Sequence, residues 1–113
     1  MKLVIAYVRQ ERMRDVKTEL AKADVHRMSI DNVRTSGDAP AVREHYRGAD
    51  LYVDTHARVR FEVAVNDAFV EPTIAAICRG AKTGEDGDGH ILVLNIEHAV
   101  KIRTDETGGD AIA

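Results

Sequence analysis

The sequence lacks several features that define protein classes. It contains no tryptophan, a single cysteine, and no apolar run approaching the ~18 residues that a membrane span needs. Because Cys78 is alone, the chain cannot form an intramolecular disulfide or a cysteine-based zinc cluster, which suits a reducing compartment. The segment Leu3–Val8 at the N-terminus is strand-like and rich in β-branched residues, unlike a signal sequence. We therefore expect a soluble, cytoplasmic protein.

The chain also lacks a strong excess of charge of either sign. Its net charge is -3 with 31% charged residues, which argues against the basic footprint of a dedicated nucleic-acid binder. With 113 residues, 44% of them hydrophobic, it is long enough for one domain with a real core. A domain of this size leaves much surface that a partner subunit could cover.

The hydrophobic pattern predicts alternating strands and helices. Extended stretches are expected at residues 4–8, 25–33, 59–65, 91–96 and 101–104, with a short helical turn at 97–100. Apolar residues with helical spacing follow the first of these stretches (Met13, Val16, Leu20, Ala23) and the third (Val70, Ile74, Ile77, Ala81). Asn66 and Asp67 are candidate caps for the second helix, and Gly80 is a candidate stop.

This order of elements indicates two successive βαβ units. Two such units in a short chain predict an α+β, ferredoxin-like sandwich of four antiparallel strands with both helices on one face. Pro72 lies where the second helix should be under way, so that helix is expected to start late or to bend. A single domain spanning residues 1–113 follows, with a flexible, frayed tail at about 105–113.

The most informative segment is the glycine-rich loop Lys82–His90, which precedes an apolar strand. Glycines at 84, 87 and 89 permit positive φ, so that successive N–H groups can point at an anion. The loop lacks the Gly-Lys-Ser/Thr ending of a P-loop and the helix that should follow it. It therefore indicates either a phosphate site or an ordinary turn.

A second unusual segment is the long insertion from about Gly37 to Thr55. Connections of this length are either functional or disordered. Its charged and aromatic side chains, which include Arg43, Tyr46 and Arg47, are of the kind that dock into a partner.

Other candidate sites are weaker. The acidic residues around Asp86 do not follow the ligand order of an EF-hand, and the five histidines include no helical i, i+4 pair, so we assign no metal. Cys78 is expected to be a buried structural thiol on the apolar side of the second helix. Glu62 could serve as an acid or base, but a cross-strand ion pair is the simpler interpretation. No catalytic residues are assigned, because nothing forms a nucleophile, base and orienting group in series.

Three segments together resemble the PII nitrogen-regulatory signal-transduction family. They are 46–62 with Tyr-Arg-Gly-Ala and Val-Arg-Phe-Glu, 83–93 with the glycine loop, and 101–104 with Lys-Ile-Arg-Thr, and the likeness covers the whole chain without gaps. The resemblance implies a non-enzymatic regulator that is a homotrimer of ferredoxin-like subunits. It also implies ATP, ADP or AMP in clefts between subunits, either with or without Mg²⁺. A long T-loop at about 37–55 would dock on a target enzyme, transporter or regulator of nitrogen or carbon metabolism, with at most peripheral membrane association through a transporter.

The resemblance also implies site residues. The nucleotide would contact Ser29, Gly37, Asp38, Ala64, Gly87, Asp88, Gly89, His90, Lys101 and Arg103. The effector position would involve Ala39 and Arg58, and the partner would meet Arg43, Tyr46, Arg47, Asp50, Leu51 and Tyr52 on the T-loop.

Several of these positions depart from the family pattern. His90 replaces the usual lysine, and Lys101 replaces an arginine, so we expect weaker phosphate contacts. Asp38 and Ala39 stand where arginine and glutamine are common, which adds repulsion for a γ-phosphate and removes an oxygen ligand for Mg²⁺. Arg58 keeps a positive charge that could hold a small anion.

The same departures affect regulation by modification and by effector. The modified tyrosine of the family maps to Leu51 and the modified serine to Ala49, so uridylylation of the usual kind is not expected. One alternative is a PII-like sensor of ADP or AMP together with a small anion such as bicarbonate, in carbon metabolism. A second is a small ferredoxin-like enzyme that uses Glu62, His56 or Asp88 at a subunit interface.

Overall fold

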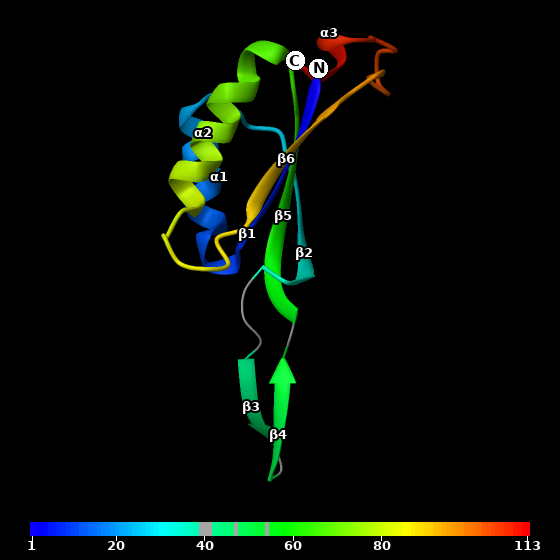
Figure 1. The fold of residues 1–113 in the computed structure, drawn as a ribbon. Coiled ribbons are helices and arrows are strands. Elements are labelled where there is room, and N and C mark those ends of the chain that lie inside the picture. The colour runs from blue at the N-terminus through cyan, green and yellow to red at the C-terminus, as the bar shows by residue number, and fades with distance from the viewer. Residues whose placement is uncertain (39–41, 47, 54) are drawn as a thin grey trace.

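A computed structural model describes residues 1–38, 42–46, 48–53 and 55–113, with the backbone alone for 42–46 and 49–53. The main sheet contains β1 (Lys2–Arg9), β2 (Ser29–Ser36), β5 (Thr55–Val65) and β6 (His90–Asn95) in the order β2-β5-β1-β6. All neighbouring strands are antiparallel. Helices α1 (Met13–Lys22) and α2 (Val70–Ala81) cover one face of this sheet (Figure 1). The predicted ferredoxin-like double βαβ sandwich is therefore confirmed.

The core lies between the helices and the sheet because apolar residues alternate along the two central strands. In β1, Val4, Ala6 and Val8 are buried, and the residues between them are partly exposed. The opposing buried residues are Val59, Phe61, Val63 and Val65 of β5, Val16 and Leu20 of α1, and Ala76, Ile77 and Ala81 of α2. The period of two in the strands and the helical spacing therefore bury the apolar sets that the sequence predicted.

Pro72 and Gly80 define how α2 is built. The segment Asp67–Phe69 forms a 3₁₀ turn and α2 begins at Val70, so Pro72 falls in the first helical turn, where its missing N–H has no helical acceptor. The expected late start is confirmed. Gly80 does not stop the helix: it is buried inside α2, where an added Cβ would lie 2.6 Å from Val16 Cα of α1. Gly80 therefore permits close contact between the helices.

The long insertion contains a second, two-stranded sheet. Strands β3 (Val42–Tyr46) and β4 (Ala49–Val53) pair in an antiparallel hairpin that extends away from the main sheet (Figure 1). The hairpin gives the molecule extents of 59 × 26 × 20 Å.

Several local predictions were wrong. Residues 25–28 are not in a strand, and β2 instead runs from Ser29 to Ser36. Residues 97–100 form no helical turn, and residues 102–104 form a turn rather than a strand, next to an isolated bridge between Val100 and Thr107. The tail is not frayed, because α3 (Gly109–Ile112) buries Ala111, and the Asn66 side chain donates to the Gly109 carbonyl over 3.1 Å. Asn66 occupies the N-cap position of the 3₁₀ turn as predicted, but its side chain binds this tail and makes no capping hydrogen bond.

Candidate functional site

The glycine loop after α2 adopts the backbone conformation that its sequence predicted. Gly84, Gly87 and Gly89 have φ values of +88°, +90° and +96°, which L side chains rarely adopt. A Cβ at Gly89 would lie 1.7 Å from the Tyr7 carbonyl oxygen of β1, so the loop rests directly on the strand backbone. In the part of the chain that the structure describes, the N–H groups of Gly87 and Gly89 donate to no protein acceptor.

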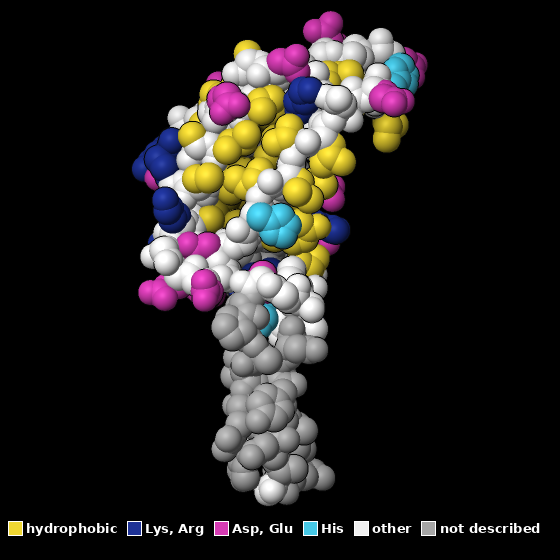
Figure 2. All heavy atoms as spheres, viewed as in Figure 1, with side chains coloured by type: hydrophobic (Ala, Val, Ile, Leu, Met, Phe, Trp, Pro, Cys, Tyr) yellow, Lys and Arg dark blue, Asp and Glu magenta, His cyan; other side chains and the backbone are white. Residues whose placement is uncertain are grey.

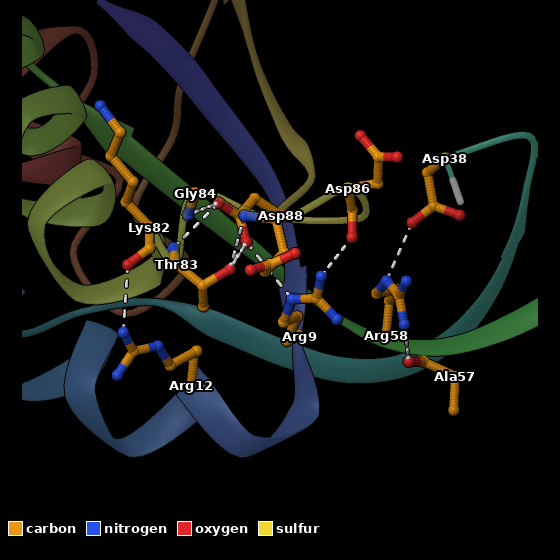
Figure 3. A network of polar contacts seen from close by, with 11 residues as sticks. Arg9, Arg12, Asp38, Ala57, Arg58, Lys82, Thr83, Gly84, Asp86 and Asp88 are labelled. Atoms are coloured by element: carbon orange, nitrogen blue, oxygen red, sulfur yellow. Dashed lines mark hydrogen bonds and ion pairs between the residues drawn. The ribbon is translucent and has the colours of Figure 1, made fainter. Parts of the chain in front are cut away.

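The Asp88 side chain points back into the same loop and organises its first half. Its carboxylate accepts hydrogen bonds from the N–H groups of Thr83 and Gly84, both at 2.9 Å, and from the Thr83 hydroxyl (Figure 3). The Thr83 hydroxyl and N–H contribute most to holding the pKa of Asp88 well below its ordinary range. Asp88 is thus an internal anion that occupies the N–H groups at one end of the loop, whereas those of the buried Gly87 and the exposed Gly89 have no acceptor among the described residues.

Two arginines that the sequence analysis did not single out fasten this loop to the rest of the fold. Arg9, the last residue of β1, donates to Asp88 Oδ1 over 3.3 Å and to the Asp86 carbonyl. Arg12, in the 3₁₀ turn before α1, donates to the Lys82 carbonyl over 3.0 Å. The only signal in the sequence was a pair of basic residues just after a strand, which is too common to indicate a role.

Arg58 is also engaged, and its partner is Asp38. The Arg58 Nε donates to Asp38 Oδ2 over 2.8 Å, and the two side chains are only 9% and 14% exposed (Figure 3). Burial raises the pKa of Asp38, but the nearby Thr35 hydroxyl and the Arg58 guanidinium more than offset this, so its pKa is lowered. The positive charge of Arg58, which was predicted to hold a small anion, is therefore already neutralised by Asp38 of the same chain.

Three polar atoms at the same end of the sheet are buried and have no hydrogen-bond partner among the described residues. They are Asp38 Oδ1, Thr35 Oγ1 and His56 Nε2. Thr35 and His56 face each other across β2 and β5. The Thr35 hydroxyl favours the Asp38 carboxylate electrostatically, yet it lies outside hydrogen-bonding geometry. Among the described residues, Arg58 therefore makes the hydrogen bond to the Asp38 side chain, and the Thr35 hydroxyl adds electrostatic stabilisation.

A groove of about 430 Å³ lies beside the glycine loop, between α2 and β6. Its lining is mostly apolar and includes Ile74, Ile77 and Ile91, with Lys82 and His90 at its polar side. Figure 2 shows hydrophobic side chains gathered over this region of the surface. The His90 ring lies 5.1 Å from that of Tyr7, measured between centroids. Cys78 also lines the groove and is exposed, so the prediction of a buried thiol was wrong.

The structure separates the remaining predicted nucleotide contacts from this loop. Ser29 and Ala64 line a different cavity of about 340 Å³. Ala64 pairs with Leu3 and His90 pairs with Tyr7, so Ala64 lies four residues from the loop along β1, or about 13 Å at strand rise. Ser29 pairs with Glu62 on β2, so β5 separates it from β1. Lys101 and Arg103 lie on the turn after β6.

Within one chain, Gly87 to His90 are together. Asp38 lies at the same end of the sheet, because its partner Arg58 is opposite Arg9, which binds Asp88. The predicted contacts Ser29, Ala64, Lys101 and Arg103 are elsewhere.

The predicted partner and effector residues lie mainly on the hairpin. Arg43 and Tyr46 are in β3, and Asp50, Leu51 and Tyr52 are in β4, with Arg43 paired opposite Tyr52. Arg47 and Ala39 lie outside the described residues. Gly37, with φ of +87° and open space around it, forms the exit from β2 toward the hairpin.

Glu62, a candidate acid or base from the sequence, forms an ion pair. The Glu62 carboxylate lies 3.6 Å from the guanidinium of Arg60 in the same strand, whereas the expected ion pair was with a neighbouring strand.

Among the described residues there is no group of three or more histidine, cysteine, aspartate or glutamate side chains arranged to hold a metal ion. None of the described helices has the length and apolarity to cross a membrane.

Comparison with known proteins gives a consistent result across the chain. Residues 1–106 match the family described as Nitrogen regulatory protein P-II. Nitrogen regulatory protein GlnK1 of Methanosarcina mazei is 44% identical over 114 residues, covering 99% of this chain and 97% of that protein. GlnK2 of Haloferax mediterranei is 40% identical, covering 99% and 91%, and a P-II protein of Bradyrhizobium diazoefficiens is 38% identical, covering 99% and 100%.

Proposed function

We propose that this chain, which belongs to the nitrogen regulatory protein P-II family, binds ADP or ATP between subunits of a homotrimer and controls a partner protein through its T-loop. It is a signal-transduction regulator of the PII type, and members of this family generally bind ATP or ADP.

The observation that carries the proposal is the glycine loop. Two of its N–H groups, at Gly87 and Gly89, have no acceptor in the described part of the protein, and the Asp88 network holds the loop in place around them. A preformed array of free N–H groups is the usual protein solution for binding a phosphate. The apolar groove next to the loop provides room for a base or ribose.

The separation of the remaining contacts supports a site that two subunits build together. Ala64 lies about 13 Å along β1 from the loop, and Ser29 is on β2, which β5 separates from β1, so one copy would supply one set and its neighbour the other. Ile102, between Lys101 and Arg103, is 97% exposed in the single chain, and Leu92, Val93 and Leu94 of the edge strand β6 are also exposed. Exposed apolar side chains in such number are typical of surfaces that another subunit covers.

The side chains around the phosphate position favour fewer phosphates. His90 provides a weaker positive charge than lysine would, and Lys101 cannot form the bidentate hydrogen bonds of an arginine. Asp38 adds negative charge nearby. ADP or AMP should therefore compete well with ATP. A small anion such as bicarbonate could serve as a second ligand at Arg58 only by displacing Asp38.

Calorimetric titration with ATP, ADP and AMP, each with and without Mg²⁺, tests nucleotide binding. We expect one nucleotide per chain and no turnover. Arg103→Ala should weaken binding at least about tenfold, because a charge-assisted contact to phosphate is worth about 1.5–3 kcal/mol. Arg14→Ala on the exposed face of α1 is the matched control and should leave binding unchanged. Turnover of the nucleotide would instead favour the enzyme alternative.

Light scattering tests the oligomer separately. A mass three times that of the chain is expected across micromolar concentrations. A stable monomer would contradict the proposal that two subunits share the site.

A further inference from the structure

The cavity that Ser29 and Ala64 line lies toward the start of β1, away from the glycine loop. Helix α3 forms one side of it, close to the N-terminus of the chain (Figure 1). Most of the lining is apolar, and the polar groups are one hydroxyl, one carboxylate and one guanidinium. The apolar residues are Leu3, Met28, Ala64, Ala111 and Ile112, and the polar ones are Ser29, Glu62 and Arg27.

Arg27, in the connection between α1 and β2, supplies the positive charge of this cavity. It is exposed, and it forms no ion pair with any residue that the structure describes. Asp24, three positions earlier, instead contacts Nε2 of His26 over 3.0 Å. The Glu62 carboxylate of the same cavity lies 3.6 Å from the guanidinium of Arg60. Both carboxylate side chains are therefore engaged with other residues, and the Arg27 guanidinium is available to a ligand.

We propose that Arg27 is a further nucleotide-binding residue, which stacks the plane of its guanidinium on the face of the base. This inference rests on the proposed nucleotide binding. If the glycine loop of one copy holds the phosphates, the cavity of its neighbour receives the opposite end of the ligand, which is the base. The groove beside the glycine loop then holds the ribose.

The chemistry of the cavity favours a base over a phosphate. Its lining is mostly apolar, and the Glu62 carboxylate would repel a phosphate placed beside it. A purine has apolar faces, and an arginine guanidinium is planar and weakly hydrated, so it stacks on nucleobases and other aromatic rings. One face of the base can therefore pack on the apolar lining while the other packs on Arg27.

The experiment is calorimetric titration of the full chain with AMP, ADP and ATP, for the unmodified protein, Arg27→Ala and Arg27→Lys. We expect Arg27→Ala to weaken binding by about three- to thirtyfold, the range of a cation–π contact. The factor should be the same for all three nucleotides, because they share one base. Arg27→Lys keeps the charge without the planar group, so it should recover little of the loss. Arg14→Ala, on the exposed face of α1, is the matched control and should bind as the unmodified protein does.

Titration with ADP at ~0.01 M and ~1 M salt provides a second measurement, because salt screens an attraction between Arg27 and a phosphate. Stacking on the base predicts a similar loss in Arg27→Ala at both salt concentrations. Unchanged affinity in Arg27→Ala, full affinity in Arg27→Lys, a loss that grows from AMP to ATP, or a loss that disappears at high salt would overturn this role of Arg27 and leave nucleotide binding intact. Absence of binding to the unmodified protein would overturn the proposed function and this inference together.

Discussion

Two glycines of one loop allow backbone strain to be separated from steric contact. Gly84 and Gly89 have nearly the same φ, +88° and +96°, but their surroundings differ. No atom lies within 4 Å of a Cβ at Gly84, whereas a Cβ at Gly89 would lie 1.7 Å from the Tyr7 carbonyl oxygen. Alanine at either position therefore imposes a similar conformational cost, and only alanine at 89 displaces the loop from β1.

The magnitudes follow from these two contributions. A side chain forced into left-handed backbone costs about 1–2 kcal/mol, which is the whole effect expected for Gly84→Ala. Insertion of a methyl group into a filled space costs a further ~1–3 kcal/mol, so Gly89→Ala should lose about 2–5 kcal/mol in free energy of unfolding. If the loop instead lifts from Tyr7, part of this stability is kept, but the phosphate-facing N–H groups move.

Urea denaturation and ADP titration of both variants at one protein concentration test this reasoning. We expect Gly89→Ala to lose ADP affinity by more than about tenfold, since a shift of the loop removes charge-assisted hydrogen bonds worth about 1.5–3 kcal/mol each. Gly84→Ala should keep affinity within about threefold, since residue 84 donates to Asp88 and not to the ligand. Equal losses of stability and affinity in the two variants would refute the assignment of Gly89 as the contact that seats the loop.

Three further predictions concern packing, pH and effector. Gly80→Ala should destabilise the fold by about 1–2 kcal/mol in urea denaturation, because a Cβ 2.6 Å from Val16 Cα costs more than the ~1 kcal/mol of helix propensity that alanine gains. Because the pKa of Asp38 is lowered on folding, its ionised form stabilises the protein above the unfolded pKa, and this contribution disappears as the pH falls through the folded pKa. The free energies of unfolding of the unmodified protein and of Asp38→Asn should therefore differ at pH 7, and this difference should shrink as the pH falls below the ordinary carboxyl pKa of about 3.9. A difference independent of pH would contradict this. Finally, calorimetry should detect no 2-oxoglutarate binding at micromolar concentration, with or without ATP and Mg²⁺. The reason is that Ala39 has no side-chain oxygen for a metal and Arg58 is already paired with Asp38. Micromolar, ATP-dependent binding of 2-oxoglutarate would overturn this prediction.

Local patterns in the sequence were sufficient to predict most of the fold. The alternation along β5 and the helical spacing of Val16 and Leu20 each depend on residues close together in the chain, so periodicity reveals which face is buried. The late start of α2 followed from Pro72 because proline acts on its own helical turn. The positive φ values in the glycine loop were predictable for the same reason.

The errors occurred where distant segments decide the outcome. Gly80 was interpreted as a helix stop because the sequence does not show that α1 passes within van der Waals distance of it. The tail was expected to fray, although Asn66 and the burial of Ala111 hold it against the domain. Cys78 lies next to the buried Ile77, yet the sequence could not show that this part of α2 borders an open groove.

The sequence by itself determined the elements, their order and the glycine loop, because backbone preference and hydrophobic period act within a few residues of each position. Only the tertiary structure decided how the charges pair. Arg9 with Asp88 and Arg58 with Asp38 join residues that are 79 and 20 positions apart in the chain. An ion pair depends on where two side chains meet in space, and the antiparallel register of β1 and β5 brings the two arginines opposite each other.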